Sequence, residues 1–349
     1  MPETDISWQD FLFSQGASLT PQTVFEIDRF SAIVPEPAGD FFSPQLHLGV
    51  LAAHGPDAAN FLHNQLTNDV LSLDDTTARL AGYCSPKGRL LATMLIWKSG
   101  EQFLMAMPRE ILPAIQKRLQ MFVMRSKLTL TDVSDSMALI GIMAPPEKLT
   151  GLSPSSLPAT SYAVTQDTSG TLIRLPDAGQ QWRYQWVGEL AQARAVWPML
   201  ARQLPPVANR LWRWSEIIAG LPQITLATQE QFVPQMVNFE LIGGVNFRKG
   251  CYPGQEIVAR SQYLGKFKRR MLIAQVDAGP IKAGMDVFSA ADPTQPCGMI
   301  VNAEPGPDGV LTCLVEIKLD AAEQPVHLGV ADGPLLHFLT LPYPIPAPA

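Results

Sequence analysis

The spacing of hydrophobic and polar positions predicts helices and antiparallel strands mixed along the first half of the chain. The stretch GPDAANFLHNQL (55–66) spaces its phenylalanine and leucines for one face of a helix, with a proline in the first turn. The stretch ARLAGYCSPKGRLLATMLIW (78–97) holds two apolar runs joined by Ser-Pro-Lys-Gly, which predicts a β-hairpin with its turn at 85–88.

Helices and strands are also expected in the middle of the chain, before a change of pattern at Met271. A helix beginning at Pro108 is expected to bury Ile111, Ile115, Leu119 and Phe122 on one face. Further helices are expected over 189–204 and 209–222, and strands over 101–107, 125–133, 137–143, 171–175 and 182–187. From Met271 onward the pattern predicts strands and turns only. This order favours an α+β fold over a doubly wound sheet, with a small C-terminal β-barrel or sandwich.

The length and the distribution of proline suggest a division into domains. A chain of 349 residues is expected to form two or three domains of roughly 100–150 residues each. The polar, proline-punctuated start predicts a loosely packed extension, and the proline- and serine-rich segment around 145–160 predicts a linker or a long loop. We therefore expect an N-terminal extension at 1–45, an α+β domain at 46–150, a second α+β domain at 151–265 and a β-barrel at 266–349.

Composition limits the class of protein. With 46% hydrophobic and 17% charged residues, the chain is expected to be globular rather than disordered. No apolar run approaches the roughly 18–20 residues of a membrane helix, and the N-terminus lacks a secretory signal, so the prediction is a cytoplasmic protein without a membrane partner. The four cysteines and five histidines are scattered, which predicts free thiols and no metal site built by the protein alone.

Positive charge is concentrated in one segment, although the net charge is −6. Between residues 248 and 270, a single acid, Glu256, accompanies the cations Arg248, Lys249, Arg260, Lys266, Lys268, Arg269 and Arg270. Such a strip favours an anionic partner, either a phosphate backbone or a cofactor that bears carboxylates. The alternative is a solvated surface loop.

The stretch KGCYPGQE (249–256) displays a cysteine in an unusual local sequence. Its two glycines allow the backbone to bend closely, and its proline stiffens the bend, so Cys251 is expected on a fixed turn. The positive neighbours Lys249 and Arg248 favour the thiolate form. The residues alone leave two interpretations open: a reactive thiol, or a structural cysteine, since free cysteine is among the most buried residue types.

The longer stretch NFRKGCYPGQEIVARSQY (246–263) resembles the signature of the YgfZ family, bacterial folate-binding proteins implicated in tRNA modification and iron–sulfur protein maintenance. Further matching segments are QLTNDV (65–70), CSPKGR (84–89), FVMRSKLTL (122–130), AGLPQI (219–224) and QFVPQMVNFELIGGVNF (231–247). The resemblance covers roughly residues 45–345 and extends to the T-protein of the glycine cleavage system. It implies a T-protein-like arrangement: ferredoxin-like α+β domains and a C-terminal β-barrel around a central channel, with tetrahydrofolate as cofactor.

The resemblance also implies roles for particular residues. Trp212 matches a tryptophan of the family's folate site, whereas Leu48 stands where the family has a second aromatic residue. Cys251 would be the reactive thiol at the channel rim, and the remaining expected contacts to the cofactor are Lys249, Gln255, Glu256 and Arg260. The alternatives are core packing for Trp212, and for Glu256 and Arg260 a helical i,i+4 pair that only stabilises its own helix.

One departure separates the two relatives. The T-protein carries an Asp-Asp pair in the second strand of the hairpin, where this chain has Ala92-Thr93. Without that carboxylate the aminomethyl chemistry loses its polarising group, while folate binding can persist. The preferred prediction is therefore a folate-binding accessory protein for iron–sulfur enzymes, including tRNA-modifying ones, rather than an enzyme.

Two other functions stay as alternatives. The first is a folate-dependent one-carbon transferase, against which the missing acidic pair counts. The second is a nucleic-acid-binding module that uses the 248–270 strip, against which the lack of interleaved aromatic and basic residues counts. Whether the protein contacts tRNA directly is left open.

Overall fold

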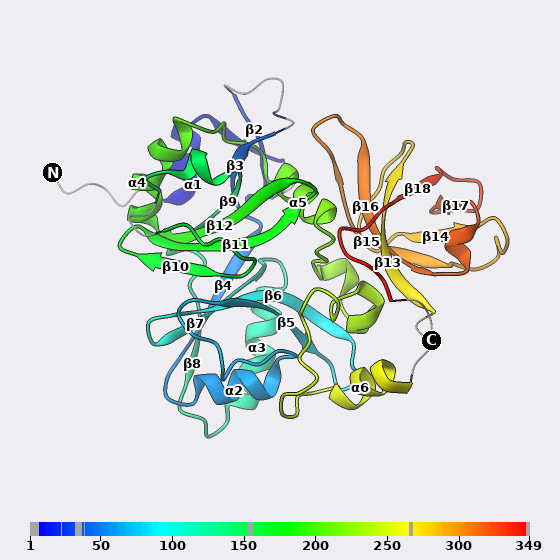
Figure 1. Ribbon diagram of the computed structural model, residues 1–349, viewed down its shortest axis with the longest axis horizontal. Coiled ribbons are helices and arrows are strands. Elements are labelled where there is room, and N and C mark those ends of the chain that lie inside the picture. Colours follow the sequence, from blue (N-terminus) through cyan, green and yellow to red (C-terminus); the bar gives the residue numbers. More distant parts are fainter. Residues whose placement is uncertain are drawn as a thin grey trace.

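The structure is a computed structural model that describes residues 7–21, 23–31, 37, 39–152, 156–264 and 268–346. Two five-stranded sheets, one six-stranded sheet and a two-stranded N-terminal hairpin are formed by antiparallel strand pairs. Figure 1 shows the two five-stranded sheets one above the other and the six-stranded sheet beside them. The expected α+β class is confirmed. No helix within the described ranges is long and apolar enough to cross a membrane.

The lower five-stranded sheet has the order β5-β6-β7-β4-β8. Its strands are β4 (Leu48–His54), β5 (Ala78–Cys84), β6 (Leu90–Ser99), β7 (Gln102–Pro108) and β8 (Thr129–Asp132), and one face packs against α2 (Ala58–Gln65) and α3 (Leu112–Val123). Strands β5 and β6 form the predicted hairpin. Its turn closes with a 2.8 Å hydrogen bond from the Ser85 amide to the Arg89 carbonyl, and Gly88 adopts a φ of +71° that favours glycine.

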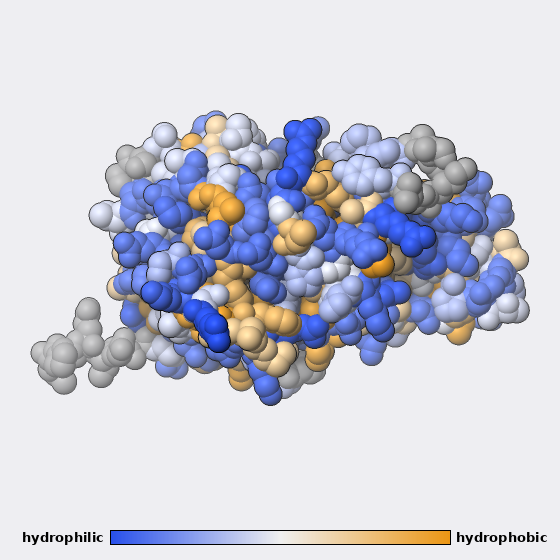
Figure 2. Space-filling view, turned by 90° about the horizontal axis from the view of Figure 1, so that it is seen from below, coloured by the Kyte–Doolittle hydropathy of each residue, from blue (hydrophilic) through white to orange (hydrophobic). Residues whose placement is uncertain are grey.

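The end of α3 differs from the expectation. Ile111, Ile115 and Leu119 are buried as predicted, but Phe122 is 46% exposed and the prediction for it was wrong. The neighbouring Met121 and Met124 are exposed as well, so the last turn of the helix extends beyond the packed face. This lower side of the molecule is the one seen in Figure 2, where hydrophobic side chains form patches among hydrophilic ones.

The upper five-stranded sheet has the order β10-β11-β12-β9-β3. Its strands are β3 (Phe41–Pro44), β9 (Met137–Met143), β10 (Val164–Asp167), β11 (Gly170–Ala178) and β12 (Gln181–Glu189), and α4 (Leu190–Ala201) packs on its outer face. Strand β9 falls in the expected first domain yet pairs with β12 of the expected second one. The domain boundaries themselves stay a prediction.

The N-terminal segment is packed, not loose. It forms α1 (Trp8–Ser14), β1 (Ala17–Leu19) and β2 (Ile27–Phe30), and Trp8 and Leu12 are buried in the outer core of the upper sheet. The ring of Trp8 stacks on Phe11 at 5.2 Å and meets the edge of Trp197 at 6.0 Å. The prediction of a loosely packed extension was wrong for the described part of this segment, because its aromatic residues supply a large apolar surface despite the polar composition around them.

The C-terminal part is a curled half-barrel sheet, as expected from its strands-and-turns pattern. Its order is β17-β14-β15-β16-β13-β18, with β13 (Arg269–Val276), β14 (Asp286–Ser289), β15 (Gly298–Pro305), β16 (Leu311–Lys318), β17 (Val326–Leu328) and β18 (Leu336–Leu339). Helix α5 (Asn209–Ile218) lies between this sheet and the two others (Figure 1). It contacts β2, β3, β11, β15 and β16, so the N-terminal hairpin, the upper sheet and the C-terminal sheet meet along one helix.

Candidate functional site

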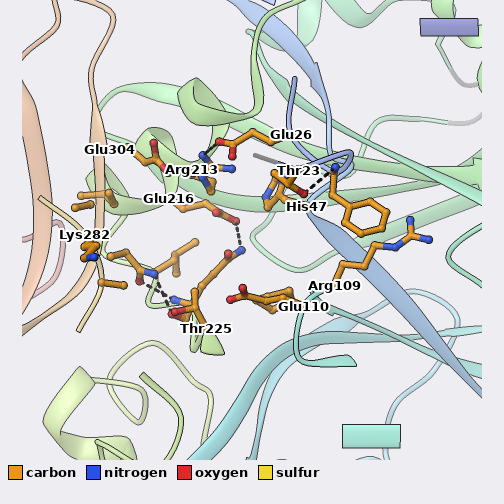
Figure 3. Close-up of a pocket in the computed structure, with 18 of the residues that line it drawn as sticks. Thr23, Glu26, His47, Arg109, Glu110, Arg213, Glu216, Thr225, Lys282 and Glu304 are labelled. Carbon is orange, nitrogen blue, oxygen red and sulfur yellow. Dashed lines mark hydrogen bonds and ion pairs between the residues drawn. The ribbon is translucent and has the colours of Figure 1, made fainter. Parts of the chain in front are cut away.

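A cavity of about 330 Å³ lies where the N-terminal hairpin, the lower sheet, α5 and the C-terminal sheet meet (Figure 3). We call it the hairpin cavity. Its volume falls within the roughly 300–1,000 Å³ typical of small-molecule sites. The residues that line it with polar or aromatic side chains are Thr23, Phe25, Glu26, His47, Arg109, Glu110, Arg213, Glu216, Gln223, Thr225, Lys282, Asn302 and Glu304.

Two further cavities lie close to the hairpin cavity. A small central cavity of about 70 Å³ shares Pro108, Glu216, Leu221 and Gln223 with the hairpin cavity. A third cavity of about 510 Å³, which we call the thiol-side cavity, shares Leu80 and Tyr162 with the central one. Shared lining residues thus make the central cavity a neighbour of both larger ones; a continuous central channel stays a prediction.

Glu216 lies on α5 at the junction of the hairpin and central cavities. Its side chain is only 13% exposed. Oε1 accepts a 3.1 Å hydrogen bond from Gln223, whereas Oε2 is buried with no hydrogen-bond partner among the described residues. Burial raises the pKa of Glu216 to about 7, against the opposing effect of Arg183 and Arg213. This carboxyl therefore has an acceptor oxygen free for a ligand.

Glu216 was not among the residues predicted from the sequence. The available signal was an acid four residues after Trp212 in the apolar stretch LWRWSEII, because this spacing places the acid on the same helix face as a buried ring.

His47 adds an unpartnered nitrogen to the same cavity. Asn209 donates a hydrogen bond to its Nδ1 at 3.0 Å, and Nε2 is buried without a hydrogen-bond partner among the described residues. Burial, reinforced by the charge of Arg213, holds the pKa of His47 well below its ordinary value. The ring is therefore neutral, with Nδ1 as acceptor and Nε2–H as an unused donor.

Arg213 joins three parts of the fold at the cavity wall. It forms ion pairs with Glu26 of the N-terminal hairpin and with Glu304 of β15 (Figure 3). Burial raises the pKa of Glu304, and the charge of Arg213 opposes that change. Arg109 and Lys282 add further positive charge to the lining.

The predicted aromatic position Trp212 lies behind this site. Its ring is fully buried, and the guanidinium carbon of Arg183 lies 4.3 Å from its centroid. With the side-chain amide of Gln45 turned so that its oxygen faces the indole, Nε1 donates to that oxygen at 2.7 Å. A Cβ on Gly141 would come within 2.4 Å of the ring, which explains a glycine there. Leu48 lines the central cavity. A direct contact of either side chain with a ligand stays a prediction.

The pair Ala92-Thr93 separates into a core residue and a cavity residue. Ala92 is buried in the lower core, whereas Thr93 lines the central cavity. The Thr93 hydroxyl donates to the Pro222 carbonyl at 3.2 Å and accepts from the Ile224 amide at 3.0 Å. The hydroxyl thus holds the loop after α5 at the position where the T-protein resemblance expected a carboxylate.

Among the four cysteines, Cys251 alone is exposed; Cys84, Cys297 and Cys313 are buried. Next to Cys251, the Nζ of Lys249 donates to the backbone carbonyls of His63 and, at 2.9 Å, Leu66. Burial lowers the pKa of Lys249 to about 8, although Asp69 and Cys251 oppose this shift. The thiol is therefore accessible beside a lysine that is fixed in place.

The turn that carries Cys251 packs on the tip of the β5–β6 hairpin. Gly254 has a φ of +81°, and a Cβ there would lie 2.4 Å from the Ser85 carbonyl oxygen. The expectation that a glycine permits a close approach is confirmed at this position. The segments KGCYPGQE and CSPKGR, far apart in the sequence, are thus in contact.

Other predicted site residues lie away from the cavities. Gln255, Glu256 and Arg260 are on α6 (Gln255–Leu264), outside the lining of the three cavities, and their contact with a cofactor stays a prediction. Asn246 and Arg248 line the thiol-side cavity and lead directly to Lys249. The thiol turn is therefore adjacent to the thiol-side cavity.

The basic strip is not one continuous surface. Arg269 pairs with Glu316 and the buried Arg270 pairs with Glu240, so both cations are neutralised by acids from other segments. Lys266 lies outside the described residues. The interpretation of 248–270 as a single anion-binding strip was wrong for Arg269 and Arg270. The order of charges along the sequence does not show which acids from distant segments pack against them in the fold.

Comparisons with known proteins bear on this site. No family model matches the chain. The chain is 33% identical over 226 residues to the tRNA-modifying protein YgfZ of Colwellia psychrerythraea, covering 64% of this chain and 68% of that protein. It is 29% identical over 293 residues to the protein of the same name from Klebsiella pneumoniae, covering 83% and 88%. The glycine cleavage system aminomethyltransferase T from Bartonella henselae shares the fold, with a TM-score of 0.75 at 15% identity over 95% of this chain and 96% of that one.

Proposed function

The chain belongs to the YgfZ family, and from this premise we propose that it binds tetrahydrofolate and supports tRNA modification by maintaining iron–sulfur enzymes. The observation that carries the ligand assignment is the pair of unpartnered buried atoms, Oε2 of Glu216 and Nε2 of His47, in one cavity. Among the described residues with such an unpartnered buried atom, His47 and Glu216 are the ones that line the hairpin cavity, and this pair favours a ligand that supplies a donor and an acceptor.

The chemistry of folate fits these walls. The pterin ring presents adjacent N–H donors along one edge, and a buried carboxylate such as Glu216 accepts from such an edge. The central cavity offers the flat ring an apolar surface that includes Leu48. Arg109 and Lys282 supply positive charge for the glutamate carboxylates of the tail. In this arrangement Trp212 contributes to the site indirectly, because its ring holds the Arg183 guanidinium beside Glu216.

The transferase alternative is weakened by Thr93. Its hydroxyl is already engaged with the loop after α5, and neither Ala92 nor Thr93 supplies a carboxylate to polarise a reacting amine. We expect no aminomethyl transfer to tetrahydrofolate when the protein is given an aminomethylated lipoyl carrier. Sustained turnover in that assay would restore the transferase.

The ligand assignment is tested by titrating the protein with tetrahydrofolate and following tryptophan fluorescence and heat of binding. Saturable binding is expected, and Glu216→Ala should weaken it roughly tenfold to hundredfold, the loss typical of hydrogen bonds to a charged group. Glu147→Gln, which changes an exposed acid outside the cavities, serves as the matched control. Absence of saturable binding by the unmodified protein would contradict the proposal.

The thiol assignment is tested separately. Alkylation with a limiting reagent near neutral pH, followed by peptide mapping, should label Cys251 first because the other three cysteines are buried. Cys251→Ser should keep folate affinity but fail to restore iron–sulfur enzyme activity in cells that lack the native protein, whereas Cys297→Ser should restore it. Full restoration by Cys251→Ser would show that the thiol is only architectural.

A further inference from the structure

We propose that Phe25 is a ligand-contacting residue of the hairpin cavity, and that the N-terminal hairpin therefore forms part of the folate site. The inference rests on the proposed function and adds to it a residue and a wall of the site. The expected ligand group is a flat aromatic ring close to a carboxylate, which in tetrahydrofolate is the benzoyl portion next to the glutamate tail.

Phe25 presents an accessible aromatic ring at the hairpin cavity. It is the only phenyl ring among the described residues that line the hairpin cavity, and it remains 36% exposed. The guanidinium carbon of Arg109 lies 4.4 Å from the ring centroid, and Arg109 is itself held by an ion pair with Asp135. One side of the ring is thus covered by a fixed cation, and the exposed part is left for a ligand.

The segment that carries Phe25 is held from several sides. The side-chain amide of Gln9 in α1 donates to the Val24 carbonyl at 2.7 Å. The backbone amide of Phe25 donates to Thr23 Oγ1 at 3.1 Å. On the other side, the Ile27 amide donates to Asn209 Oδ1 at 2.6 Å. Together with the Glu26–Arg213 ion pair, these contacts place the ring beside the cavity before any ligand binds. A preorganised wall loses little entropy on binding.

A neighbouring cavity shows why this ring matters. Phe25 and Arg109 also line a fourth cavity of about 340 Å³, together with Leu48, so the two side chains form a partition between it and the hairpin cavity. Leu48 offers an aliphatic side chain without a flat face. Aromatic rings pair with other rings in offset or edge-to-face geometry, and Phe25 is the side chain placed for such a pair on this side of the site.

The test compares tetrahydrofolate affinity among three variants of Phe25. Phe25→Ala should weaken binding roughly fivefold to hundredfold, the range for loss of one stacking contact. Phe25→Leu keeps an apolar side chain of similar size without a ring and should also weaken binding, whereas Phe25→Trp should retain it and make the new indole fluorescence sensitive to the ligand. Phe13→Ala is the matched control, since Phe13 is a 45% exposed phenylalanine of α1 outside the cavity lining.

The outcomes separate the inference from the proposed function. If the unmodified protein binds and the Ala and Leu variants bind equally well, Phe25 is not a ligand contact, while the proposed function stands. If the Leu variant binds as well as the unmodified protein and only the Ala variant is weaker, the ring is packing, and the inference is overturned. If the unmodified protein does not bind tetrahydrofolate, both fall. Thermal unfolding of each variant checks that the fold is kept.

Discussion

At the scale of single residues, Glu216 shows how a site group can be prepared by its surroundings. Burial of an isolated carboxylate costs free energy. Here the Arg183 guanidinium, 4.0 Å from Oε1 of Glu216, offsets this cost only in part, so the pKa of Glu216 remains raised to about 7. A group that titrates near neutrality can be proton donor or acceptor toward a ligand. The same property makes the stability of the protein depend on pH.

The first prediction concerns Glu216→Gln. Because burial raises the pKa of Glu216 from 4.5 to about 7, the folded protein keeps a proton that the unfolded chain has lost in this window. Its contribution to the free energy of unfolding therefore falls as pH rises from 4.5 to about 7 and is level above that. The glutamine variant should lack this slope, with a difference from the unmodified protein that changes by roughly 3 kcal/mol across the window in urea titrations. A difference independent of pH would contradict it.

At the scale of elements, one side chain at the start of α5 helps to hold the N-terminal hairpin in place. Asn209 accepts from the Ile27 amide, donates to the Pro44 carbonyl at 2.9 Å and donates to His47. It is fully buried, so each of these groups would lose its partner without access to bulk water. One amide thus couples the hairpin, β3 and the cavity histidine.

The second prediction concerns Asn209→Ala. It should lower the free energy of unfolding by at least about 2 kcal/mol, because several buried polar groups lose their partners at once. Amide hydrogen exchange of residues 17–30 should accelerate more than that of the lower sheet. Asn209→Asp keeps an acceptor for Ile27 and should protect the hairpin better than alanine does. Equal exchange in the two variants would show that the hairpin is held by other contacts.

Sequence patterns predicted most of the long elements and missed several of the short ones. Helix α2 and the β5–β6 hairpin follow from periodicity because each shows several repeats of its pattern, whereas β3 and β17 are too short to show one. Cys251 is exposed and Leu48 lines the central cavity, and their roles in the site stay predictions. Phe25 and His47 could not be found, since they become neighbours of Glu216 only when the hairpin, the lower sheet and α5 pack together.

At the scale of the whole molecule, the Glu26–Arg213–Glu304 ion pairs connect the N-terminal hairpin, α5 and the C-terminal sheet. All three side chains are largely buried, with exposed fractions of 22% for Arg213, 30% for Glu26 and 16% for Glu304. Partly buried pairs of this kind bind parts together, because the loss of one partner leaves the others buried and unpaired. The cavity wall and the contact between the parts of the fold are thus the same set of residues.

The third prediction concerns Arg213→Met. Removal of the cation should cost about 3–5 kcal/mol, because two carboxylates remain without a partner in a largely buried position. Calorimetry should show the C-terminal sheet unfolding as a separate, earlier transition. Combining Arg213→Met with Glu304→Gln removes one of the two unpaired carboxylates and should recover part of the lost free energy of unfolding. A single transition with less than about 1 kcal/mol of change would show that the ion pairs do not couple the parts.

The wall of the hairpin cavity has a consequence for the newborn chain. Ribosomes release a protein from its N-terminus, so Phe25 and Glu26 emerge early, whereas Lys282 and Glu304 emerge only near the end of synthesis. A nascent chain therefore has no closed binding chamber until its last strands leave the ribosome. Ligand capture would mark a finished molecule, and a product cut short before β15 would present the N-terminal hairpin but hold nothing.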